Sequence, residues 1–217
     1  MVYSFTYGSQ SDLTSMSSGI SSSGTGTNAS GVNDFQGGTQ DNGTITVVVN
    51  GVAADTGLVV TIREDARNHR TAEPATCAVY GNGTVLCKST DKVNSEEYAL
   101  LRVLGQNFVD PSQIDAKNQW KIALKNPSLS MSSEFTVRKN DNGILSIDET
   151  RKIDRKGAQA SMTQVTGKIL YDQNKTLPLS LFEQTIERGN VPGGGYRTVN
   201  TQIDLKLSSD SMGAKLP

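Results

Sequence analysis

The stretch Asn94-Ser95-Glu96-Glu97-Tyr98-Ala99-Leu100-Leu101-Arg102-Val103-Leu104-Gly105-Gln106-Asn107-Phe108-Val109 has the periodicity of an amphipathic helix. Nearly all other periodic segments of the chain alternate with the period of strands. At about 100° per residue, one arc of the helix carries polar side chains, and these are Arg102, Gln106 and Asn107. The opposite arc is apolar and contains Tyr98, Leu100, Leu101, Leu104, Gly105 and Phe108. The apolar arc has to be buried from water, and in this chain the element available to bury it is a sheet.

Both ends of the helix carry sequence signals. Asn94 is followed three residues later by Glu97, which is the spacing of a capping box, and carboxylates in the first turn suit the positive end of the helix dipole. Pro111 stops the helix. We therefore predict a helix over about 94–109 around which the sheet is built.

Short alternating segments on both sides of this helix predict strands, and turn signals such as Asn142-Gly143 separate them. The predicted strands cover residues 2–7, 44–50, 58–63, a hairpin over 77–87, 120–125, 129–139, 145–153, 163–171, 177–186 and 199–207. The predicted fold class is mainly β (α+β). It is a curved antiparallel β-sheet, a meander or half-barrel of about eight to ten strands, packed on one principal amphipathic helix.

The chain of 217 residues is long enough for one domain with a sizeable core, and we predict a single domain over 1–217. Residues 8–42 consist mostly of Ser, Gly, Thr, Asn and Gln and have almost nothing to bury. This composition predicts a Ser/Gly-rich polar loop or mobile segment there. The sheet-plus-helix core is then expected over 43–210.

The two cysteines flank a hairpin loop at Gly81-Asn82-Gly83, and pairing across it puts Cys77 directly opposite Cys87. This position predicts a disulfide, and the alternative is two buried free thiols on one face. A disulfide implies an extracytoplasmic location, whether periplasmic, cell-surface or secreted, with a signal sequence absent from this chain.

Charge and hydropathy exclude several partners. Lys and Arg number 21 and Asp and Glu 22, so the net charge of −1 does not favour a nucleic-acid partner. No apolar run reaches the roughly 20 residues of a membrane span.

Residues 140–143 with Glu149 resemble half of a calcium loop, but Arg138 stands at its first position and the flanks alternate like strands, so a hairpin turn is expected. We expect no metal and no cofactor.

The sequence also lacks a recognisable catalytic constellation. His69 is the one histidine, and there is no Gly-x-Ser-x-Gly motif, so a solvated loop histidine is the expectation. Asp148 and Glu149 alternate onto opposite faces of a strand, which makes them a poor pair for acid and base catalysis. The charge run Arg151–Lys156 is typical of a solvated strand end, with binding to an acidic surface as the alternative. We expect no enzymatic activity.

The order of these segments resembles that of the bacterial lipoprotein-carrier family and its secreted relatives. A short first strand and a polar excursion precede two strands, a hairpin and the helix, and long antiparallel hairpins follow. In that family an incomplete antiparallel barrel wraps helices, and its concave apolar face receives acyl chains. The resemblance implies a lipid or other apolar ligand, here held by Tyr98, Leu101, Leu104 and Phe108.

Two functions follow from these observations. The first is a secreted or cell-envelope, non-catalytic domain that binds an apolar ligand or lipid in the concavity between sheet and helix. The second is a structural or surface protein-interaction module without a small-molecule ligand, in which the helix fills that space. In the second case an envelope or surface protein is recognised by the outer sheet or the Ser/Gly-rich segment. An apolar pocket between helix and sheet would separate the two.

Overall fold

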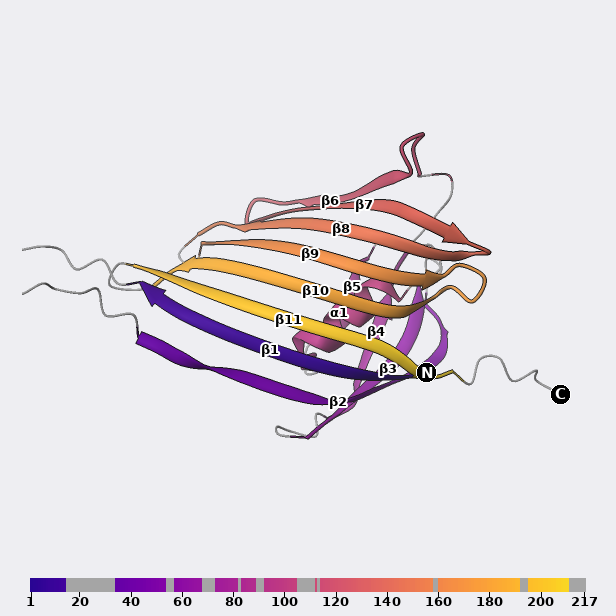
Figure 1. The fold of residues 1–217 in the computed structure, drawn as a ribbon, viewed down its shortest axis with the longest axis horizontal. Coiled ribbons are helices and arrows are strands. Elements are labelled where there is room, and N and C mark those ends of the chain that lie inside the picture. The colour runs from indigo at the N-terminus through magenta and orange to yellow at the C-terminus, as the bar shows by residue number, and fades with distance from the viewer. Residues whose placement is uncertain are drawn as a thin grey trace, which may run out of the picture.

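The computed structural model describes residues 1–14, 34–53, 57–67, 73–81, 83–88, 92–104, 112, 114–157, 160–191 and 195–210. Within these residues, 11 strands form one antiparallel sheet, and a single helix lies against one of its faces (Figure 1). The predicted class, a curved antiparallel sheet packed on a helix, is confirmed.

The elements in the first half of the chain are β1 (Val2–Thr14), β2 (Asp34–Val52), β3 (Leu58–Ala66), β4 (Ala75–Val79), β5 (Val85–Cys87) and α1 (Ser95–Val103). Those in the second half are β6 (Gln119–Lys125), β7 (Leu129–Asp141), β8 (Ile144–Arg155), β9 (Ser161–Asp172), β10 (Leu177–Asn190) and β11 (Tyr196–Ser209).

The sheet consists of two meanders joined along the first and last strands. The strand order is β5-β4-β3-β2-β1-β11-β10-β9-β8-β7-β6, so β1 and β11 pair in the middle (Figure 1). Phe5 lies opposite Leu205 in this pairing, and both side chains are buried. The chain crosses from the β5 edge to the β6 edge by way of α1, which the prediction of one continuous meander did not anticipate.

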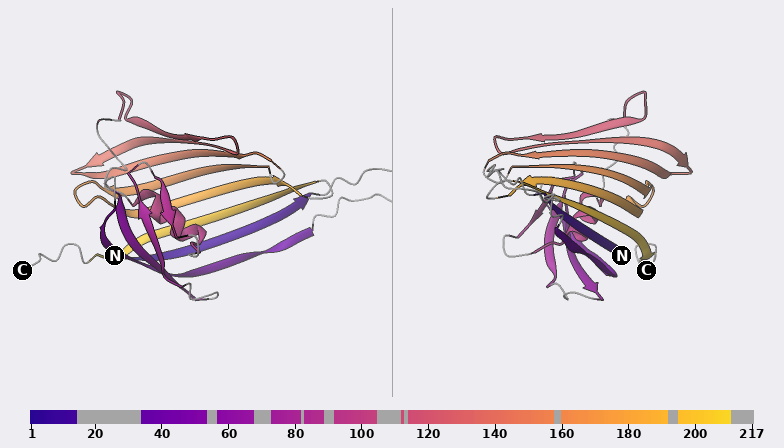
Figure 2. Two further views of the ribbon diagram at one scale, coloured as in Figure 1. Left: turned by 180° about the vertical axis from the view of Figure 1, so that it is seen from behind. Right: turned by 60° about the vertical axis from the view of Figure 1, so that its left-hand side comes forward.

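Helix α1 covers part of the concave face of the sheet, where it contacts β10, β11 and β5 (Figure 2). Leu100 and Leu101 are fully buried there. They belong to the same core as side chains of the central and outer strands, which include Tyr3, Ile45, Ile62, Ile147, Ile169 and Leu205. Each such large apolar side chain contributes roughly 1.5–3 kcal/mol when it is fully buried. The helix is therefore part of the core of the molecule.

The helix is shorter than predicted. It begins after Asn94, whose backbone N–H donates to the Glu97 carboxylate at 2.9 Å, as the predicted capping box requires. It ends at Val103, because Leu104 leaves the helical conformation with φ −88° and ψ 87°. The rest of the predicted helix, including Phe108, lies outside the described residues.

The polar segment 8–42 is partly strand. Strand β1 continues to Thr14, and β2 begins at Asp34, so a loop was the wrong prediction for these two stretches. Their pairing depends on backbone groups, and β1 has β2 on one side and β11 on the other, so polar side chains are tolerated. Residues 15–33 lie outside the described part of the chain.

The disulfide is confirmed. Cys77 and Cys87 face each other across β4 and β5 and are bonded, with an S–S distance of 2.03 Å. Such a bond fits an oxidising, extracytoplasmic compartment. In the described residues, no helix has the length and apolarity needed to cross a membrane.

Candidate functional site

Four charged side chains lie between α1 and the sheet, and we call Arg102, Glu149, Arg151 and Glu183 the charge cluster. Arg102 was predicted on the polar face of the helix, but its exposure is 6%. Its Nη1 and Nη2 donate to Glu149 Oε1 and Oε2, both at 2.8 Å, and Nη2 also donates to Glu183 Oε2 at 2.8 Å. The prediction was wrong because the sheet curves around the helix, so more than its apolar arc is covered.

Arg151 completes the charge cluster from β8. It is also 6% exposed, and its Nη2 donates to Glu183 Oε1 at 3.0 Å. The prediction of a solvated strand end was therefore wrong for this residue. Burial would raise the pKa of Glu183, but Arg102 and Arg151 outweigh it and hold that pKa below its usual value.

Space for this cluster comes from a glycine in the middle of β9. Gly167 pairs with Glu149, and a Cβ on Gly167 would lie 3.3 Å from Glu149 Oε2. The neighbouring Asp148 points to the opposite face, where it accepts a hydrogen bond from Arg138 Nε at 2.8 Å, as strand alternation predicted. With two positive and two negative members, the charge cluster is balanced and ties α1 to β8 and β10.

Three more carboxylates gather where the helix begins. Glu64, Glu96 and Glu97 are all buried, and Asn94 Nδ2 donates to Glu64 Oε2 at 3.1 Å. Burial, with a smaller contribution from the Glu64 charge, raises the pKa of Glu96 and that of Glu97 to about 7. Within the described residues, no group of three or more His, Cys, Asp or Glu side chains is arranged to hold a metal ion.

The side chains predicted to hold an apolar ligand do not share one environment in the structure. Leu101 and Leu104 are buried in the core, with exposures of 0% and 2%. Tyr98 lies on the same helix with 43% of its surface exposed. Phe108 lies outside the described residues.

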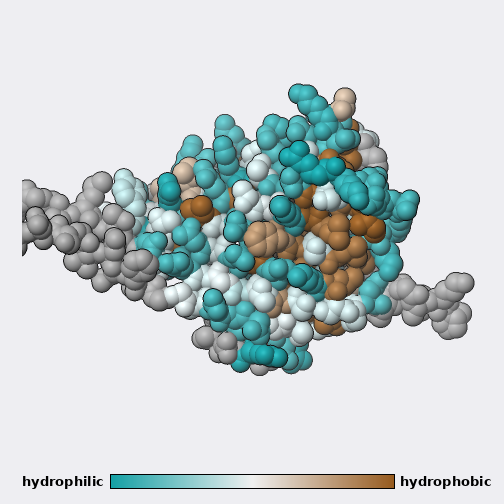
Figure 3. Space-filling view, in the orientation of Figure 1, coloured by the Kyte–Doolittle hydropathy of each residue, from teal (hydrophilic) through white to brown (hydrophobic). Residues whose placement is uncertain are grey.

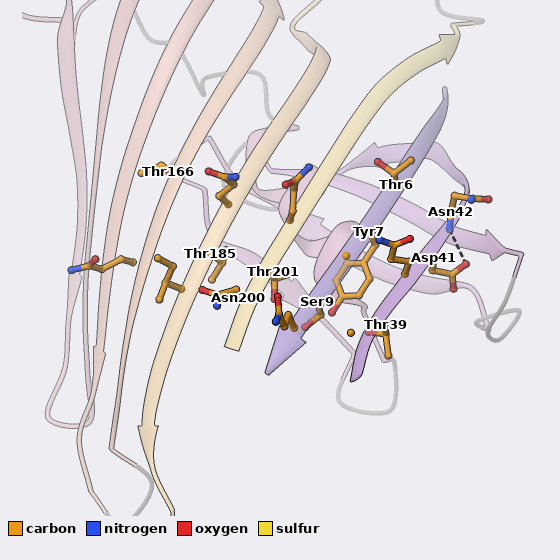
Figure 4. A pocket seen from close by; sticks show the side chains of 18 residues that line it. Thr6, Tyr7, Ser9, Thr39, Asp41, Asn42, Thr166, Thr185, Asn200 and Thr201 are labelled. Carbon is orange, nitrogen blue, oxygen red and sulfur yellow. Dashed lines mark hydrogen bonds between the residues drawn. The ribbon is translucent and has the colours of Figure 1, made fainter. Parts of the chain in front are cut away.

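A hollow of about 810 Å³ lies over β9, β10, β11, β1 and β2 (Figure 4). We call it the amide hollow, because glutamines and asparagines from all five strands line it, together with threonines. Its lining residues are Thr6, Tyr7, Gly8, Ser9, Gln10, Gly38, Thr39, Gln40, Asp41, Asn42, Gln164, Thr166, Gln184, Thr185, Ile186, Asn200, Thr201 and Gln202. Among these described residues, Asp41 is the one with a charged side chain.

The amide hollow is on the face of the sheet turned away from α1. Tyr3 and Phe5 are buried in the core, so strand alternation turns Thr6 and Gly8 to the other face. Ile203 and Leu205 of β11 are likewise buried, which turns its even-numbered residues outward. Figure 3 shows this outer face, which is mostly teal and white toward the left, whereas apolar surface gathers toward the right.

The strand register aligns the lining side chains into rows that run across the sheet. Gln184 lies opposite both Thr166 and Gln202, and Gln202 lies opposite Gly8. One row is therefore Thr166, Gln184, Gln202, Gly8 and Gln40, and the row beside it is Gln164, Ile186, Asn200 and Gln10.

The row of amides has a gap at Gly8. A Cβ on Gly8 would meet nothing within 4 Å, so the space above this residue is open. Gln184, Gln202 and Asn200 are exposed, and within the described part of the chain their side chains make no hydrogen bond to the protein. Their donors and acceptors therefore face the hollow and are available to a ligand.

Sequence reasoning missed this site. It treated 8–42 as a loop, and it identified strands over 177–186 and 199–207 without assigning a role to their polar side chains. The available signal was the type of residue, because Gln184, Asn200 and Gln202 are uncharged amides where Lys and Glu are more usual on an exposed face. Which strands are neighbours was not available from the sequence, so the rows were not predictable.

Comparison with known proteins finds no relative of this chain. No protein-family model, curated protein or solved structure matches the chain. The functional assignment therefore rests on the geometry and chemistry of the sites described above.

Proposed function

We propose that this protein is a non-catalytic binding domain of an extracytoplasmic compartment, and that it holds an uncharged, polar ligand in the amide hollow. The observation that carries this proposal is the hollow itself. Its volume of about 810 Å³ lies within the range of roughly 300–1,000 Å³ that is usual for small-molecule sites. Its lining offers hydrogen bonds from several side chains that the protein leaves unused.

The chemistry of the lining favours a ligand rich in hydroxyl or amide groups. Each glutamine or asparagine presents a carbonyl acceptor and two N–H donors, and Thr6 and Thr166, exposed on this face, each present a hydroxyl that both donates and accepts. A charged ligand would find few opposite charges, because Asp41 is the one charged side chain among the described lining residues. A ligand with alternating donors and acceptors therefore fits this surface best.

The position of the hollow favours a rigid site. Strands β10, β11 and β1 each pair with neighbours on both sides, so the backbone under the ligand is held in place. Binding sites on rigid elements lose less conformational entropy when the ligand binds. Only the amide side chains therefore have to become ordered when the ligand binds, because the backbone beneath them is already fixed.

The experiment compares ligand binding by the wild type with binding by Gly8→Leu, which adds a side chain in the open space above Gly8. Calorimetric titration with a panel of uncharged saccharides, polyols and Gly/Ser peptides is expected to find a ligand for the wild type. Gly8→Leu should bind it at least about tenfold more weakly, because the side chain occupies the site.

Asn190→Ala serves as the matched control. Asn190 is an exposed amide on the same face of β10 but lies outside the hollow, and its removal should leave binding unchanged. Failure of the whole panel to bind, or equal binding by Gly8→Leu and the wild type, would contradict the proposal.

An apolar ligand or lipid between α1 and the sheet is the second candidate function. The observation in its favour is the architecture, an open curved sheet whose concave face is covered by one helix of nine residues (Figure 2). Because Leu101 and Leu104 are buried, such a ligand would have to displace part of the helix. Native mass spectrometry of the purified protein should then reveal a co-purified apolar molecule.

A further inference from the structure

We infer that the ligand of the amide hollow is a linear, uncharged oligosaccharide whose chain runs across the strands. This inference rests on the proposed function and adds to it the class of ligand and the direction in which it lies. Three features of the hollow lead to it: the spacing of the rows, the gap at Gly8 and the strands that lie underneath.

The first feature is a regular repeat of polar groups across the sheet. Thr166, Gln184, Gln202 and Gln40 belong to one row, and each step between neighbouring strands is about 4.8 Å. A ligand that meets such a row along its length needs polar groups at a similar repeat. A chain of pyranose rings has this property, because each ring carries hydroxyl groups and adds a length close to one strand spacing.

The second feature is the shape of the row. Gly8 stands between Gln202 and Gln40, and the open space above it leaves room for the thickness of a sugar ring. In the adjacent row, Ile186 is 41% exposed and offers an apolar surface next to Asn200. Sugar rings present C–H groups as well as hydroxyls, so a mixed surface of this kind matches both.

The third feature distinguishes a saccharide from a peptide. A peptide that binds by adding a strand to a sheet gains most of its affinity from backbone hydrogen bonds at a free sheet edge. Most of the hollow lies over β9, β10, β11 and β1, whose backbones already pair with neighbours on both sides, while its β2 part pairs with β1 and the β2–β3 pairing begins at Gly43. The groups left for a ligand are side-chain amides and hydroxyls, and a hydroxyl-rich chain uses them without needing an edge.

The test is calorimetric titration of the full chain with β-1,4-linked oligomers of glucose and of N-acetylglucosamine, from one to six units. Affinity should rise with chain length up to roughly five units, because the lining residues come from five strands. A Gly/Ser hexapeptide is titrated in parallel and should not bind.

The double substitution Gln184→Ala/Gln202→Ala removes two neighbouring amides of the row. Both side chains are exposed, so the fold should be retained, and a thermal melt checks this. Binding of the hexasaccharides should weaken on the order of tenfold or more, as expected when two ligand hydrogen bonds are lost. Asn190→Ala, the exposed amide outside the hollow, should bind them like the wild type.

The outcomes separate this inference from the proposed function. If a monosaccharide binds as tightly as the hexasaccharide, or if the peptide binds and saccharides do not, the inference is overturned while the hollow still holds a polar ligand. Hexasaccharide binding that the double substitution leaves intact also overturns the inference. If no ligand depends on Gly8, both the inference and the proposed function fail.

Discussion

At the scale of single residues, the main departure from expectation is Arg102. A charged side chain on a mostly apolar helix is normally assigned to solvent, but here it makes three charge-assisted hydrogen bonds below the helix. Burial favours the neutral form of an arginine, yet Glu149 and Glu183 outweigh it and raise the pKa of Arg102. The positive charge is therefore retained within the core.

Arg102→Ala should destabilise the protein strongly. The substitution leaves Glu149 buried without its partner, and breaking a buried ion pair from one side costs about 3–5 kcal/mol. Urea unfolding followed by circular dichroism measures the change in the free energy of unfolding.

Arg138→Ala is the matched control for that measurement. Arg138 pairs with Asp148 on the surface, where both side chains are well exposed, and such pairs contribute about 0–1 kcal/mol. A loss for Arg102→Ala no larger than that for Arg138→Ala would show that the charge cluster does not hold the helix.

The carboxylates at the start of α1 should make stability depend on pH. Their pKa in the folded protein, about 7 for Glu96 and Glu97, is above the ordinary value of 4.5. The folded state therefore binds protons more tightly, and this contribution to stability is fully present below about 4.5 and lost as the pH rises toward 7. The contribution of Glu96 and Glu97 to the melting temperature should therefore fall between about pH 4.5 and pH 7.

Glu97→Gln tests this expectation, because glutamine keeps the oxygen that accepts the Asn94 N–H but carries no charge. The substitution should raise the free energy of unfolding at pH 8 by about 1–3 kcal/mol, with a smaller gain at pH 5. Urea unfolding at both pH values measures the difference. Glu134→Gln, at an exposed position, should show no such dependence, and equal effects of Glu97→Gln at the two pH values would refute the argument.

At the scale of elements, α1 fills the space that the curved sheet leaves on its concave side. Its apolar arc supplies Leu100 and Leu101 to the core, where Leu104, directly after the helix, joins them, and its C-terminal turn supplies Arg102 to the charge cluster. A helix of nine residues is too short to be stable alone, so these tertiary contacts hold it.

Leu104→Ala measures how the helix is packed. If α1 is core, the substitution should cost about 2–5 kcal/mol, and added long-chain fatty acid should leave the melting temperature of the wild type unchanged. Leu124→Ala on β6, where the side chain is 49% exposed, should cost less than about 1 kcal/mol. A small loss for Leu104→Ala together with a rise in melting temperature on adding fatty acid would favour an apolar ligand beside the helix.

At the scale of the whole molecule, the pairing of β1 with β11 unites two meanders into one sheet. The two strands pair along nearly their full length, from Val2 with Ser209 to Thr14 with Tyr196. The centre of the sheet is therefore built from segments that are far apart in the sequence. The amide hollow depends on this joint, because its rows run from β9 through β10 and β11 to β1, and one of them continues to β2.

Amide hydrogen exchange should reflect this arrangement. The backbone amides of β1 and β11 should be among the slowest to exchange, because these strands have a neighbour on each side and lie at the centre of the sheet. Edge strands β5 and β6 should exchange much faster. Exchange of β11 at the rate of β6, measured by mass spectrometry at neutral pH, would mean that the two meanders open independently.

The sequence by itself determined what depends on local pattern. Alternation identified the segments that form strands, Asn94 with Glu97 identified the start of the helix, and the spacing around Gly81–Gly83 placed Cys77 opposite Cys87. Each of these features involves residues close in the chain, and their spacing records the period of the backbone conformation.

The tertiary structure alone decided which strands are neighbours and what surrounds each polar residue. Whether Arg102 meets solvent or Glu149 depends on a strand 47 positions later, and whether Gln184 stands beside Gln202 depends on register. Backbone pairing also kept the polar parts of β1 and β2 extended where their side chains have little to bury, because there β1 pairs with both β2 and β11, and β2 pairs with β1. Long-range contacts leave no period in the sequence, so the charge cluster and the amide hollow became visible only when the sheet was assembled.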